Sequence, residues 1–150
     1  MPMTTNTPCG ISQRTQWMQK YAAYQQNFIA ARDAFNEANT LLHSPALDGM
    51  PHGTGKSDPV ANQVEHYNKS YRQYIYARDA MAVAKNKRLR AMQPLNSDQQ
   101  VVLQALYFDH LSRRAIAKEL GKSDFWVRAQ ERTGLFLLEL PSGWEADILP

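Results

Sequence analysis

The sequence has little of several features that would assign it to a class at once. It holds a single cysteine, Cys9, among 150 residues, so an internal disulfide is impossible and a reducing compartment fits best. The longest apolar runs, such as 135–138, fall far short of the roughly 20 residues that span a bilayer. The first residues lack the charged and then apolar pattern of a signal peptide. We therefore expect a cytoplasmic protein with no membrane partner.

Residues suited to catalysis or metal binding are scattered along the chain. No metal-ligand spacing links Cys9 to any of the four histidines, which are His43, His52, His66 and His110. No pair of carboxylates lies in an apolar context, and no serine lies at a strand-to-helix turn. We expect neither an enzyme nor a protein that binds a metal or cofactor.

Positive charge is concentrated in one part of the chain. The formal net charge is only +3, and the hydrophobic and charged fractions of 43% and 21% are ordinary for a soluble domain. Residues 69–90, however, carry seven basic side chains against the single acidic side chain of Asp79. Such a block attracts polyanions, of which nucleic acid is the commonest in the cytosol.

Two long helical patterns occupy the region 11–93. In the first pattern, large apolar residues and alanines recur at alternating spacings of four and three: Trp17, Tyr21, Tyr24, Phe28, Ala31, Phe35, Ala38 and Leu42. The second begins at Asp58-Pro59, a typical helix start, and continues the spacing with Val60, Val64, Tyr67, Tyr71, Tyr74, Arg78, Met81 and Lys85. The two stripes predict an antiparallel hairpin, which is also a candidate oligomerisation region.

Proline and glycine mark a loop at 43–58 between these helices. Its segment 53–57 (GTGKS) resembles the end of a phosphate-binding loop. Met50, however, stands where that motif requires a glycine, and no strand precedes it. We expect no nucleotide site there.

Three shorter helices are predicted in the region 94–140. Ser97 or Asp98 is expected to cap a helix at 99–110 with Val102, Leu103, Leu106 and Tyr107 on its apolar face. A helix at 112–120, a turn at Gly121-Lys122 and a helix from Ser123 follow. Gly134 is expected to interrupt that last helix, because glycine costs about 1 kcal/mol relative to alanine. Residues 1–10 and 141–150 are expected to be tails, the first of them disordered. The predicted fold class is all-α.

The stretch 111–128 has the spacing of a helix-turn-helix. Ile116 and Leu120 are predicted to face the core, and the small Ala117 to lie where two helices approach closely. Gly121 suits a left-handed turn, Ser123 suits a helix cap, and Val127 is predicted to face back onto the first helix; all six assignments follow from the spacing. The alternative is a three-helix bundle that binds only protein.

The segments IAKELGKS (116–123) and WVR (126–128) carry a family resemblance. Residues 111–138 are similar to the fourth, promoter-recognising region of bacterial sigma factors. The layout of the whole chain resembles phage late-transcription regulators of the RinA and ArpU type. The resemblance implies a DNA-binding activator of phage late or packaging genes, located in a bacterial cytoplasm, with host RNA polymerase as a possible partner.

The helix-turn-helix register also predicts which side chains face DNA. The candidates for base contacts are Ser123, Asp124, Phe125, Arg128, Ala129 and Arg132, with Arg128 first because guanidinium pairs bidentately with guanine. The candidates for phosphate contacts are Arg113, Arg114, Lys118, Lys122, Lys85, Lys87, Arg88 and Arg90. The last four are equally compatible with a solvated helix face.

The function that these predictions favour is a sequence-specific DNA-binding transcription regulator, which would bind two half-sites as a homo-oligomer. A phage packaging protein, such as a terminase small subunit, is one alternative. In those proteins, however, the DNA-binding module usually comes first, whereas here it is last. A helical adaptor that binds protein and no DNA is the other alternative.

Overall fold

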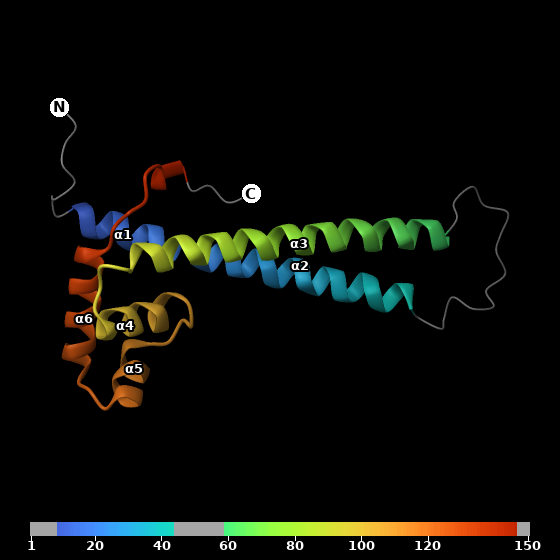
Figure 1. The fold of residues 1–150 in the computed structure, drawn as a ribbon. Coiled ribbons are helices and arrows are strands. Elements are labelled where there is room, and N and C mark those ends of the chain that lie inside the picture. The colour runs from blue at the N-terminus through green and yellow to red at the C-terminus, as the bar shows by residue number, and fades with distance from the viewer. Residues whose placement is uncertain (1–8, 44–58, 147–150) are drawn as a thin grey trace. The chain divides into compact units, whose positions relative to one another are not determined.

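The computed structural model describes residues 9–43 and 59–146, and all regular structure in these two ranges is helical (Figure 1). The all-helical prediction is confirmed. Helix α1 (Cys9–Gln19) begins inside the stretch that we expected to be a tail, so that expectation is wrong for Cys9 and Gly10. The expected loop from 44 onwards, with its GTGKS segment, lies outside the described residues.

The chain divides into two compact units. Of the described residues, 9–24 and 83–146 belong to the first unit, and 25–43 and 59–82 belong to the second. Helices α2 (Tyr21–Leu42) and α3 (Pro59–Ala91) each contribute residues to both units. This division differs from the boundary after residue 93 that the sequence suggested, because α1 and the ends of the long helices pack with the C-terminal helices.

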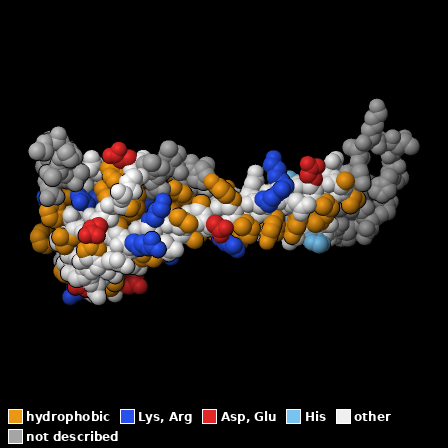
Figure 2. Space-filling model, turned by 45° about the horizontal axis from the view of Figure 1, so that its top comes forward, with side chains coloured by type: hydrophobic (Ala, Val, Ile, Leu, Met, Phe, Trp, Pro, Cys, Tyr) orange, Lys and Arg blue, Asp and Glu red, His pale blue; other side chains and the backbone are white. Residues whose placement is uncertain are grey.

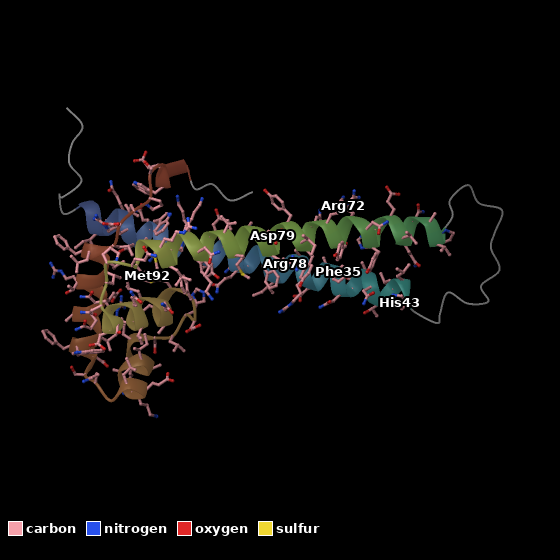
Figure 3. The ribbon with its side chains drawn as sticks, in the orientation of Figure 1. Phe35, His43, Arg72, Arg78, Asp79 and Met92 are labelled. Atoms are coloured by element: carbon pink, nitrogen blue, oxygen red, sulfur yellow. The ribbon has the colours of Figure 1, made fainter. Side chains whose placement is uncertain are left out.

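Aromatic rings hold the second unit together. The ring of Phe28 on α2 lies 5.7 Å from that of Tyr74 on α3, and the ring of Phe35 lies 5.3 Å from that of Tyr67. Figure 3 shows Phe35 on the side of α2 that faces α3. Contact positions fall along α3 as they rise along α2, so these segments run antiparallel. Such ring pairs each contribute about 0.5–1.5 kcal/mol beyond the area they bury.

The apolar stripe predicted on α3 is partly wrong. Val60, Val64 and Tyr71 are 47%, 40% and 47% exposed, whereas the small Ser70 is buried. Tyr71 nonetheless lies 5.5 Å from the ring of Phe35, so a half-exposed residue of the stripe still takes part in the contact with α2. The four-three spacing alone did not show which residues of α3 are buried.

The first unit is built around the C-terminal helices α4 (Ser97–Tyr107), α5 (Arg113–Leu120) and α6 (Asp124–Leu137). Both α4 and α5 pack against α6, and α1 packs against α6 as well (Figure 1). One core cluster consists of Val102, Ile116, Ala117 and Val127, with Ala105, Leu106 and Trp126 packed against it. A short 3-10 turn, η2 (Trp144–Ala146), follows in the segment that we expected to be a tail.

The start of α4 lies two residues earlier than predicted. Its N-cap is Asn96, whose side chain accepts a hydrogen bond from the backbone N–H of Gln99, and the Gln99 side chain accepts one from the backbone N–H of Asn96. This capping box satisfies two backbone donors at once. The expectation of a cap at Ser97 or Asp98 is therefore wrong.

Helix α6 continues through Gly134, so the predicted interruption is also wrong. A Cβ atom at this position would lie 3.1 Å from Cδ1 of Leu103 and 3.4 Å from Cβ of Gln99. Both of these residues belong to α4 and are buried. The glycine is explained by the close approach of α4 and α6 and not by a break in the helix.

Candidate functional site

The connection between α5 and α6 is a tightly specified turn. Gly121 ends α5 in the left-handed conformation, with φ 65° and ψ 35°. The backbone N–H of Lys122 then donates to the carbonyl of Ala117 over 2.8 Å. The predicted glycine turn is confirmed, and its positive φ explains why a residue without a side chain stands there.

Serine side chains begin both helices of this connection. The Oγ of Ser112 accepts a hydrogen bond from the N–H of Ala115 at the start of α5, and the Oγ of Ser123 accepts one from the N–H of Trp126 at the start of α6. The predicted Ser123 cap is therefore confirmed. Because this oxygen is bound to the backbone of α6, its first role is to fix the helix start.

The core beneath the turn agrees with the prediction except at one residue. Ile116, Ala117 and Val127 are 2%, 4% and 0% exposed, as expected. Leu120, which we expected to face the core, is 38% exposed. It is the last residue of α5, and the chain turns away at Gly121 directly after it. Val127 therefore packs against Ile116, and Leu120 is not part of this core cluster.

An exposed face of α6 points away from this core. We call it the outer face and define it by the exposed residues Phe125, Arg128, Arg132 and Phe136. Their spacings of three, four and four residues place them on one side of a helix. Of the other base-contact candidates, Asp124 is exposed and Ala129 is half-buried on the same side. Asp124 lies in the first turn, where the helix dipole favours an acidic group.

Arg113, a predicted phosphate contact, is already paired within the molecule. Its Nε and Nη2 atoms donate to the two carboxylate oxygens of Glu131 over 2.6 and 2.8 Å. This hydrogen bonding raises the pKa of Arg113. The bidentate pair ties α5 to α6 and offsets the positive charge. Sequence reasoning missed the pair because its members lie 18 residues apart on different helices.

The remaining predicted phosphate contacts on α5 and its turn are exposed. Arg114 and Lys118 lie on α5 with exposed side chains. The Nζ atom of Lys122 lies 5.4 Å from the ring centre of the half-buried Trp126, in a cation–π arrangement. These three cations are available to an anionic partner.

The basic end of α3 contains both surface and core residues. Lys85, Lys87 and Arg90 are exposed, and the Nζ atom of Lys85 lies 5.5 Å from the ring centre of Phe108. Arg88, predicted as a phosphate contact, is fully buried, so that prediction is wrong.

The aromatic residues of α1 and α2 surround the Arg88 guanidinium. Its two terminal nitrogens donate to the carbonyls of Ala84 and Trp17 over 3.0 and 2.6 Å. Its central carbon lies 4.4 Å from the ring of Trp17, and Tyr21 and Tyr24 lie within 5.9 Å. Cation–π attraction and hydrogen bonds thus replace water around the charge. No local signal predicted this role, because Trp17 lies 71 residues away.

The described helices hold neither a group of metal ligands nor a membrane-spanning segment. Within residues 9–43 and 59–146, no three histidine, cysteine, aspartate or glutamate side chains are grouped as metal ligands would be. Nor does either range contain a helix with the length and apolarity that crossing a bilayer requires.

Comparison with known proteins found no matching family model, no matching curated protein and no matching solved structure. The geometry of the α5–α6 connection and the chemistry of the outer face are therefore the basis for a functional proposal.

Proposed function

We propose that this chain is a sequence-specific DNA-binding transcription regulator, in which α4, α5 and α6 form a helix-turn-helix domain that places the first part of the outer face of α6, from Phe125 to Arg132, in the major groove. One observation carries the proposal. A glycine turn and a serine cap fix the start of α6, its Val127 is buried against Ile116 of α5, and Arg128 and Arg132 remain exposed. A helix held in this way is the element that such domains insert into DNA.

Within this proposal, the exposed cations have two different roles. Arg128 lies near the start of α6, the part of a recognition helix that meets base edges, and its guanidinium matches the two acceptors of guanine. Arg114, Lys118 and Lys122 contact phosphates, which contribute affinity but little sequence information. Arg113 contributes less than these, because Glu131 already neutralises it.

A regulator that reads two half-sites needs two copies of its DNA-binding domain. We propose that the second unit supplies the contact between copies. Its helices leave Val60, Val64 and Tyr71 substantially exposed, and Figure 2 shows hydrophobic side chains along the surface of these helices. The resemblance to phage late regulators supports the proposal that such an oligomer acts in a bacterial cytoplasm, near phage late or packaging genes.

The test is fluorescence anisotropy of the full chain against a random-sequence duplex at two salt concentrations. Each phosphate contact should add about 0.9 to the slope of log affinity against log salt. Lys118→Ala should lower this slope by about 0.9, the value of one phosphate contact, and weaken binding to all sequences alike. Arg128→Ala should instead reduce discrimination at one base pair of a preferred site by about 1–3 kcal/mol. Equal losses on every sequence for both variants would refute the division of roles.

The absence of binding to any duplex at low salt would refute the proposal as a whole. The protein-binding adaptor would then be the better interpretation, and one observation favours it as the second candidate. Phe136 and Leu137, at the end of α6, are 57% and 43% exposed and present apolar surface suited to a protein partner.

A further inference from the structure

Phe125 is the most exposed large apolar side chain in the described part of the chain, at 83% of its surface. It is the second residue of α6 and follows the Ser123 cap by two positions. An exposed ring forgoes the stabilisation that burial of an aromatic side chain would give. Packing within the fold therefore does not explain why a phenylalanine stands at this position. The capped start of α6 nevertheless holds its backbone in a fixed place.

The charges near Phe125 restrict what its partner can be. The exposed cations Lys122 and Arg128 flank it in the sequence, and Asp124 is the only acidic side chain between them. A partner that suits this surface must be anionic overall and still offer an apolar group to the ring. Duplex DNA meets both conditions, because the C5 methyl of thymine projects into the major groove beside the base-edge acceptors and donors.

We propose that Phe125 is a specificity-determining residue that contacts the C5 methyl group of a thymine. The inference rests on the proposed function, and it adds a preference for thymine at one position of the site. The neighbouring Trp126 is not available for this contact, because it is half-buried against the core cluster and lies beneath Lys122.

Phe136 provides a matched control on the same outer face. It is also a phenylalanine with an exposed side chain, at 57%. It lies eleven residues further along α6, which corresponds to about 16 Å of helix. The residues that contact base edges lie at the beginning of a recognition helix, so Phe136 should not meet the same base.

The test begins by selecting a preferred duplex from a random library with the full-length protein. Each thymine in that duplex is then replaced by uracil, which removes the C5 methyl and keeps every hydrogen-bonding group. We expect one position at which uracil weakens binding of the unsubstituted protein by about fourfold, the value of one buried methyl group. Phe125→Ala should bind the thymine and uracil duplexes equally, while Phe136→Ala should keep the fourfold difference. Both variants should unfold like the unsubstituted chain, since neither ring is buried.

The failures of the two proposals are distinguishable. If no duplex is enriched or bound, the DNA-binding proposal and the inference both fail. If a duplex is bound but no thymine is sensitive to uracil, or if Phe125→Ala keeps the sensitivity, the inference alone is overturned. A Phe125→Ala variant that loses more affinity for single strands than for duplexes would also overturn it, because stacking on an unpaired base would then explain the exposed ring.

Discussion

Replacement of Gly134 by alanine provides a test of how α4 and α6 pack. At an exposed helix position, this change would stabilise the protein by about 1 kcal/mol, because alanine is the better helix former. At residue 134, the new Cβ would lie 3.1 Å from Cδ1 of Leu103. Leu103 is 0% exposed, so it must shift inside a packed core, and overpacking of this kind costs about 1–3 kcal/mol. The two opposing contributions leave an expected net decrease of up to about 2 kcal/mol in the free energy of unfolding.

The assay is urea unfolding of the full chain, followed by circular dichroism. Gly134→Val should lose more stability than Gly134→Ala, because its two additional methyl groups enter the same space. Leu103→Ala removes the side chain that the new Cβ would meet, so the combined Gly134→Ala and Leu103→Ala variant should lose less than the sum of the single losses. Stabilisation by Gly134→Ala would refute the close-packing argument, as would strict additivity in the double variant.

Three further predictions concern the first unit. Ile116→Asp should abolish cooperative unfolding, because it buries a carboxylate. Leu120→Asp, at a position that is 38% exposed, should still fold, and similar melts of the two variants would refute the burial of Ile116. Burial, together with the charge of Glu131, raises the pKa of Tyr107. The unfolded chain therefore releases the hydroxyl proton of Tyr107 at a lower pH than the folded chain does. The contribution of this group to the free energy of unfolding is fully present below about pH 10 and is lost as pH rises further. Tyr107→Phe should lose less stability than the unsubstituted chain in alkaline melts, and an unchanged loss would contradict this origin. Asn96→Ala should lower the free energy of unfolding by about 1 kcal/mol, because the side-chain cap of α4 is lost. Asn96→Ser, which can still cap the helix, should keep most of that stability, and equal losses in both variants would exclude capping as the cause.

The α5–α6 connection was largely predictable because its determinants are local. Gly121 and Ser123 act within a few residues of their own positions, through a left-handed backbone and a hydrogen bond to the next turn. The burial of Ile116 and Val127 follows from helical spacing over a short range. The exposure of Arg128 followed from the same register.

Other parts of the site depended on neighbours that are remote in the sequence. Its charge and its place on the supporting helix suggested that Arg113 would contact phosphate, but its pairing with Glu131 requires α5 and α6 to be packed together. Leu120 fits the apolar spacing of α5, yet the helix ends beside it and leaves it exposed. Periodicity describes one helix at a time and does not show which part of its face a second helix covers.

The sequence by itself determined the all-helical class, where α3, α5 and α6 begin, and how α5 turns into α6. These features depend on backbone preferences and on hydrogen bonds that span a few residues. Only the tertiary structure decided that Arg88 lies in an aromatic enclosure, with Trp17 supplying a carbonyl and a ring from another helix. It also decided that Gly134 serves a contact between helices, since the space available to its Cβ is set by Leu103 and Gln99 on α4. Their roles depend on groups that only folding brings within reach.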